Sequence, residues 1–273
     1  MKEITLVNLI NGARHDIDEV EEQIHLSATG YENATSTNEK VRILRMLAEL
    51  DPPLPYHEQR IMELMQMGLT DASGPVRLQA VESIFAFSSK TPSLSQAILH
   101  SLAGVFAEDH NQAVAERAGH HISMIVSGFD PVRMDRFIAD QLEILELSPI
   151  ESEAAQAAIL LGISKSHSAI RPLWGNRDHP STEVQVKIAW ALGQLGLFVQ
   201  DNRLSRYLRI LIDDIERDSK VSITAQFQLK TYNEIREKAL NLPNHTVLLL
   251  PVNGWPRGNQ FVPPRMVDLP LKK

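Results

Sequence analysis

The chain has 273 residues, of which 43% are hydrophobic and 22% charged, as is ordinary for a soluble, well-packed protein. It contains no Cys, which excludes disulfide bonds, thiolate metal sites and cysteine nucleophiles. The net charge is −7, and the four basic residues and one acidic residue after Leu240 leave −10 on residues 1–240, so a nucleic acid is not expected as the partner.

Residues 1–37 are predicted to form one or two helices that cap the rest of the chain, ending in a polar loop from Asn33 to Asn38. Met1 to Asn11 lacks the long apolar core and the cleavage site of a signal peptide. The longest uncharged stretch of the next region, Ala154 to Ser164, is far shorter than the roughly 20 residues that span a bilayer. We therefore expect no membrane span and a cytoplasmic location.

One pattern recurs across residues 38–240. A polar turn, often opened by Asp, precedes a Val, and apolar residues follow about four and eight positions later; the clearest copies are Asp71–Ile84 and Asp178–Gly193. These offsets fall on one face of a helix, and an Asp, Asn or Ser in the turn can accept a hydrogen bond at the helix start. The intervening segments predict partner helices at His57–Gly68, Leu94–Phe106, Pro131–Leu145, Ser168–Trp174 and Asn202–Glu216.

The spacing of this pattern indicates a repeat. Steps of 35, 38, 40, 30 and 37 residues separate the anchors Val41, Val76, Val114, Ala154, Val184 and Val221. Asp71–Ile84 and Asp178–Gly193 resemble HEAT repeats, in particular the short HEAT-like subgroup. The resemblance implies an all-α solenoid of about six antiparallel helix pairs, with an irregular helical bundle as the alternative. The family's ladder of turn Asp and following Arg has both members only at Asp71 and Arg77.

Residues 241–273 have a different composition. Five of the chain's 15 prolines lie between Pro251 and Pro270, so this segment is predicted to be an extended tail rather than a helix. In one interpretation the apolar run Leu248–Val252 covers the end of the last repeat. In the other the tail docks on a partner, with Trp255 and Phe261 as anchors.

A binding surface is predicted on the second helices of the later pairs. Offsets two and six from each anchor should project away from the core, and several of these positions are apolar. The ridge expected to be exposed there consists of Leu160, Val186, Trp190, Ile223 and Phe227. A contiguous apolar patch usually marks a contact surface, for the tail or for a partner. The alternative is that adjacent helices bury these residues.

The search for catalytic groups finds none. HEAT-type deoxyhypusine hydroxylases hold two irons with several His-Glu pairs, whereas this chain has one, His57-Glu58. HEAT-like DNA glycosylases need a basic groove, and nothing specific supports the substrate of HEAT-like bilin lyases. His120 and His121 point about 100° apart on a helix and do not suit one metal ion. No catalytic residue, metal or cofactor is predicted.

The sequence thus predicts a protein-binding scaffold or adaptor, not an enzyme, whose partner is another protein. Architecture alone supports this, which makes it an analogy at the level of the fold. The alternatives are an enzyme on a HEAT-like scaffold, of the bilin lyase or DNA glycosylase type, and an accessory subunit of a larger assembly.

Overall fold

The computed structural model describes the backbone of residues 2–199, 202–214 and 218–240, and the side chains of residues 17–197, 203–214 and 218–234. In these ranges the chain forms twelve α-helices and two 3₁₀ helices, and no strand. The α-helices are α1 (Lys2–Asn33), α2 (Thr37–Glu49), α3 (Pro55–Leu69), α4 (Gly74–Ser88), α5 (Ser95–Glu108), α6 (Gln112–Ser127), α7 (Pro131–Leu147), α8 (Glu151–Ile163), α9 (Ile170–Gly175), α10 (Thr182–Val199), α11 (Asn202–Asp213) and α12 (Ser219–Leu240). The 3₁₀ helices are η1 (Pro92–Leu94) and η2 (His167–Ala169).

The twelve helices follow one another along the chain as six consecutive pairs, each joined by a short turn. Every predicted anchor lies in the second helix of a pair, and all of them except Val41 are buried. The partner helices begin within two residues of the predicted starts. The prediction of an all-α fold of solenoid-like helix pairs is therefore confirmed. The region predicted as one or two N-terminal helices contains the single helix α1.

The chain divides into two compact units, residues 1–105 and 106–273. In the first unit, α1 packs against α2 and α3, and α2, α3 and α4 pack against one another. Its core consists of apolar side chains with almost no exposed surface, including Leu44, Leu47, Ile61, Met65, Ile84 and Phe87. The predicted division into a cap at 1–37, an array at 38–240 and a tail at 241–273 stays a prediction, and the tail lies outside the described residues.

The turn between α3 and α4 joins the first four helices through Asp71. The Asp71 carboxylate accepts hydrogen bonds from Lys40 Nζ at 2.7 Å, from the Tyr31 hydroxyl at 3.2 Å and from the backbone N–H of Ser73 at 2.8 Å. Arg77 Nη1 donates to the backbone carbonyl of Asp71 at 2.8 Å. Side chains of α1, α2 and α4 therefore meet at this one turn.

These contacts alter the acidity of two groups. Burial by itself would raise the pKa of Asp71, but the hydrogen bonds from Lys40 and Ser73 and the positive charge of Lys40 outweigh it, so the net pKa is below the usual value. Burial and the neighbouring Asp71 carboxylate both raise the pKa of the Tyr31 hydroxyl. The folded turn thus favours a charged Asp71 next to a neutral Tyr31.

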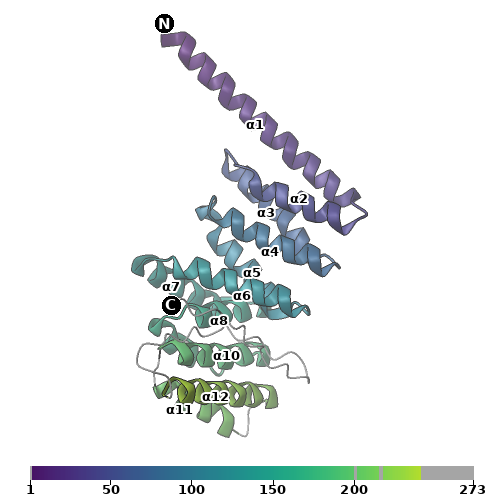
Figure 1. Ribbon diagram of the computed structural model, residues 1–273. Helices are drawn as coiled ribbons and strands as arrows, with labels where there is room; N and C mark the ends of the chain where they lie inside the picture. Colours follow the sequence, from purple (N-terminus) through teal and green to yellow (C-terminus); the bar gives the residue numbers. More distant parts are fainter. Residues whose placement is uncertain (1, 200–201, 215–217, 241–273) are drawn as a thin grey trace. The chain divides into compact units, whose positions relative to one another are not determined.

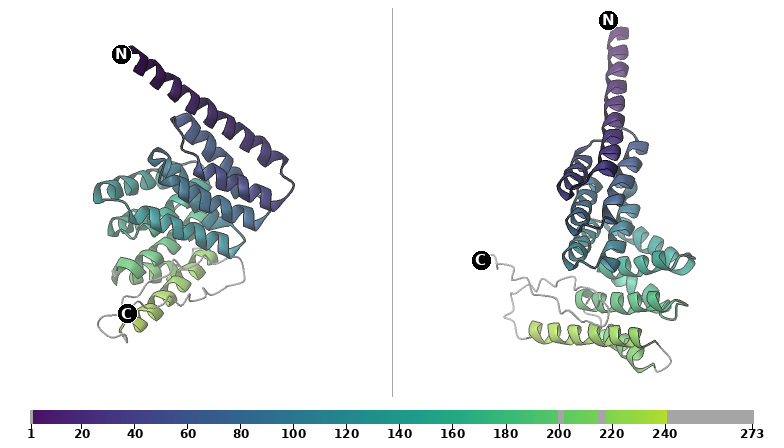
Figure 2. Two further views of the ribbon diagram at one scale, coloured as in Figure 1. Left: turned by 45° about the horizontal axis from the view of Figure 1, so that its top comes forward. Right: turned by 90° about the vertical axis from the view of Figure 1, so that its right-hand side faces the viewer.

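In the second unit, α7 packs against α8, α9 against α10 and α11 against α12. The second helices of these pairs form a layer in which α10 lies between α8 and α12. Figures 1 and 2 show α10 and α12 side by side in this layer. Because α10 has neighbours in both directions and on the side of the first helices, its residues from Val186 to Leu197 are all buried.

Small residues allow α8 and α10 to approach closely. A Cβ atom added at Gly162 of α8 would lie 2.7 Å from both Cα and Cβ of Ala191 on α10, a distance shorter than van der Waals contact. The obstacle includes backbone, which cannot rotate away as a flexible side chain can. Gly162 is therefore required by the spacing of these two helices.

We expect Gly162→Ala to lower the free energy of unfolding by about 1–2 kcal/mol, because the helices must separate to admit the methyl group. Urea unfolding followed by circular dichroism measures this difference. Gly175→Ala is the matched control, since a Cβ atom at the end of α9 would meet nothing within 4 Å. Equal stability of both variants would contradict the close contact between α8 and α10.

Candidate binding site

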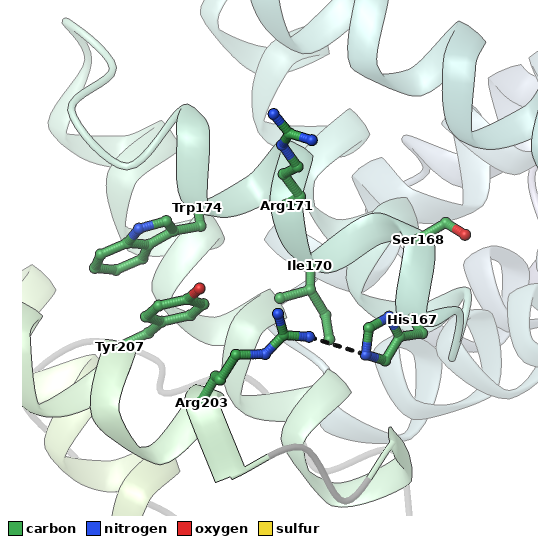
Figure 3. Close-up of a pocket in the computed structure, with 7 residues that line it drawn as sticks. All are labelled: His167, Ser168, Ile170, Arg171, Trp174, Arg203 and Tyr207. Carbon is green, nitrogen blue, oxygen red and sulfur yellow. Dashed lines mark hydrogen bonds between the residues drawn. The ribbon is translucent and has the colours of Figure 1, made fainter.

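A pocket of about 520 Å³ opens between the first helices of the last two pairs. Figure 3 shows the seven side chains that line it, which come from η2, α9 and α11. They are His167, Ser168, Ile170, Arg171, Trp174, Arg203 and Tyr207. The volume lies within the range of natural ligand pockets, which is roughly 300–1,000 Å³.

Apolar anchors place the lining residues of α9. The short helix is held by Ile170 and Leu173, both buried in the unit, while Arg171 stays exposed and Trp174 half-buried. Before it, the Ser166 hydroxyl caps η2 by accepting a hydrogen bond from the backbone N–H of Ser168. The two buried residues thus fix the orientation of α9, and Ile170 also forms part of the pocket lining.

Helix α11 is strongly two-sided. Leu204, Leu208 and Leu211 are buried against the unit. Arg203, Arg206, Tyr207 and Ile210 are spaced at i, i+3, i+4 and i+7, which places them together on one side of the helix, next to the buried leucines. Ile210 is 40% exposed, an unusual location for a large apolar side chain beside two arginines. We call this set of four residues the α11 outer face.

One wall of the pocket is an aromatic stack. The rings of Trp174 and Tyr207 lie 4.1 Å apart between centroids and only 8° from parallel. The Arg177 guanidinium lies 4.7 Å from the Trp174 centroid. Arg177 also donates to the Trp174 carbonyl at 3.2 Å and pairs with Asp178 at 3.1 Å.

The rest of the rim is polar and basic. Arg203 Nη2 lies 3.1 Å from His167 Nε2, which joins α11 to η2 across the pocket. Figure 3 shows Arg203 directed towards His167, whereas Ser168 points away from both. Arg171 adds a second guanidinium from α9, and none of the seven lining residues is acidic. The pocket therefore offers guanidinium groups beside an aromatic wall.

The predicted exposed ridge is wrong for three of its five residues. Leu160 and Trp190 have no exposed surface, and Val186 has 6%. The Trp190 ring packs against Phe106, with 5.4 Å between centroids, and lies over Gly162. The prediction assumed that offsets two and six point to solvent on every second helix, but α8 and α10 have neighbours on those sides as well. None of these three residues is available to a partner in this fold.

The other predicted binding residues have separate outcomes. Ile223 on α12 is 59% exposed and Phe227 is half-buried, so these two can still contact a partner, and their role stays a prediction. Trp255 and Phe261 lie outside the described residues. The structure does not bring the five ridge residues together on one surface.

The histidines considered for metal binding are separate from the pocket. His57 is buried in α3, and His120 and His121 have ring centroids 5.8 Å apart on α6. Among the residues that the structure describes, no group of three or more His, Asp or Glu side chains is arranged to hold a metal ion. None of the described helices is long and apolar enough to cross a membrane.

The pocket residues were not predicted from the sequence. A signal was present in the α11 outer face, because its spacing combines Arg203, Arg206 and Tyr207 with an apolar Ile210 on one side of a helix. Its partners on η2 and α9 lie about 30 residues earlier, and only the packing of α9 and α11 in successive pairs brings them near.

No family model matches the chain, and no curated protein does. Solved structures with a similar arrangement include a designed armadillo repeat protein (18% identity, 80% of this chain and 100% of that one, TM-score 0.33). The Escherichia coli protein YibA is similar at 18% identity, over 82% of this chain and 77% of that one, with a TM-score of 0.36. Human deoxyhypusine hydroxylase in complex with glycerol has 15% identity, over 77% and 84%, with a TM-score of 0.32.

The class of protein is defined by the packing of its helices. The chain is an all-α protein whose helices pack in successive pairs, as in a repeat solenoid.

Proposed function

We propose that this chain is a protein-binding scaffold or adaptor that holds a partner protein through the pocket between α9 and α11 and through the adjoining α11 outer face. The observation that carries the proposal is the pocket itself, in which exposed guanidinium groups stand beside a rigid stack of Trp174 and Tyr207. A cytoplasmic location is part of the same proposal.

The composition of this surface supports recognition of a protein. Trp, Tyr and Arg are the residues most enriched among those that contribute most to binding energy in protein interfaces. The α11 outer face extends the pocket with Arg206 and the partly exposed Ile210, so apolar and charged contacts are available side by side. Aromatic rings that are already held in position lose little conformational freedom when a partner binds.

The geometry favours binding over catalysis. A catalytic serine needs a base within hydrogen-bond reach, and Ser168 points away from His167 in the pocket. The seven lining residues include no Asp or Glu, and the Nε2 atom of the one histidine, His167, is 3.1 Å from Arg203, which can only donate to it. The arrangement is therefore better suited to holding an anionic or polar surface than to transforming a substrate.

Site-specific photo-crosslinking tests the proposal. Tyr207→p-benzoylphenylalanine places a crosslinker at the pocket, and irradiation in extracts of the cells that make the protein is expected to give a discrete protein adduct. The control is Tyr56→p-benzoylphenylalanine on α3, because Tyr56 is an exposed tyrosine outside the pocket. Absence of an adduct from position 207, the same adducts from both positions, or adducts to nucleic acid alone would refute the proposal.

A further inference from the structure

We infer that the pocket between α9 and α11 takes the carboxylate side chains of an acidic peptide segment. The inference rests on the proposed function, because it names the chemistry of the partner that the scaffold would hold. The side chains involved come from η2, α9 and α11. Their charge, their positions and the contacts already made by Trp174 support this ligand.

The charged groups of the pocket suit carboxylates. Arg171 and Arg203 enter from two different helices, and each guanidinium presents a planar fork of N–H groups that can donate two parallel hydrogen bonds to one carboxylate. Arg203 Nη2 donates to His167 Nε2, 3.1 Å away, so the imidazole orients this guanidinium at the pocket. With no acidic residue in the lining, nothing there repels an incoming carboxylate.

The local charge contrasts with that of the whole chain. The chain carries a net charge of −7, yet α11 contains Arg203, Arg206 and Arg209, and its only acidic residue is Asp213 at its last position. Arg171 adds a further positive charge from α9, whereas the charge of Arg177 is paired with that of Asp178. A positive surface on an acidic protein steers negatively charged partners towards one place and away from the rest.

The aromatic stack argues for a peptide over a nucleic acid. Proteins that bind single-stranded nucleic acid stack bases on open aromatic faces. Here Trp174 is already engaged by two neighbours, because Tyr207 stacks on its ring and the Arg177 guanidinium lies 4.7 Å from its centroid. The cavity of about 520 Å³ is also larger than a single small anion requires, so it has room for a side chain and part of its backbone.

Fluorescence anisotropy with a rhodamine-labelled polyglutamate peptide tests the inference on the full chain. The polyglutamate peptide is expected to bind at least roughly tenfold more tightly than matched polyglutamine or polylysine peptides, and its affinity should fall as salt is added. Arg171→Gln and Arg203→Gln are each expected to weaken binding by roughly tenfold or more. Arg203→Lys keeps the positive charge but cannot donate two parallel hydrogen bonds. Its affinity for polyglutamate should therefore lie between those of Arg203→Gln and the unaltered protein.

The control is Arg209→Gln, which removes the same charge from the same helix at an exposed position outside the pocket. It is expected to change the affinity by less than about twofold. Equal weakening by Arg209→Gln and Arg203→Gln would overturn the inference, because non-specific electrostatic attraction between the peptide and the positive charge of α11 would then explain the binding. Tighter binding of single-stranded oligothymidylate than of polyglutamate would also overturn it. Circular dichroism melting of each variant checks that the fold is retained.

The two proposals can fail separately. Protein adducts from position 207 without polyglutamate binding would leave the scaffold function standing and overturn the acidic ligand. Polyglutamate binding that depends on Arg203, without any protein adduct, would support the pocket's chemistry and count against the scaffold function.

Discussion

Trp190→Ala is expected to lower the free energy of unfolding by about 3–5 kcal/mol, which is among the largest losses that one core substitution causes. Trp190 has no exposed surface, and its ring packs on Phe106 and over Gly162. Truncation to alanine removes most of the side chain's volume from the interior of the second unit and leaves a cavity that the rigid helices α8 and α10 fill only in part. Urea unfolding followed by circular dichroism measures the loss.

The control for this experiment is Ile223→Ala on α12, which comes from the same predicted ridge but is 59% exposed. We expect a change within about 0.5 kcal/mol, because most of that side chain already contacts water. A Trp190→Ala protein as stable as Ile223→Ala would show that Trp190 is a surface residue after all, and the burial described for α10 would be wrong.

Asp71→Asn is expected to lower the free energy of unfolding by about 2–3 kcal/mol at pH 7, because a carboxylate that accepts hydrogen bonds from Lys40, Tyr31 and Ser73 becomes a neutral amide. The pKa of Asp71 is lower in the folded protein than in the unfolded chain. Its contribution is therefore complete above the unfolded value of about 3.9 and is lost as the pH falls through the folded value.

The stability difference between the original chain and Asp71→Asn should accordingly be constant near neutral pH and shrink in acid below about pH 4. Urea unfolding at a series of pH values measures it. Asp51→Asn is the matched control, since Asp51 is an exposed aspartate in the loop after α2, and it should alter stability little at any pH. A difference for Asp71→Asn that grows as the pH falls has the wrong sign for this account.

The helix pairs were predictable because the signals that define them are local. Val76 and Val184 recur with small apolar residues at helical spacing, and Pro75 lies in the first turn of α4, where its missing N–H does no harm. These features depend on residues a few positions apart. They were sufficient to place the second helix of every pair and to begin each partner helix within two residues of its observed start.

The binding surface was harder to predict because it depends on which helix faces pack against one another in the folded chain. Trp190 was expected at the surface from its offset alone, but Phe106, far away in sequence, covers it. Conversely, Trp174 and Tyr207 are ordinary half-buried aromatic residues until α9 and α11 pack in successive pairs and bring the rings together. The pattern of apolar residues in a single sequence shows which side of a helix is buried. It does not show how many neighbouring helices pack against the other sides.

The pocket draws its lining from two successive helix pairs, since Arg171 and Trp174 belong to one and Arg203 and Tyr207 to the next. In a stack of helix pairs each pair is stabilised chiefly by its immediate neighbours. A ligand that touches both pairs can bind only while they are packed together, so by mass action it opposes their separation. Occupancy of the site would thus stabilise the packing of the α9–α10 pair on the α11–α12 pair.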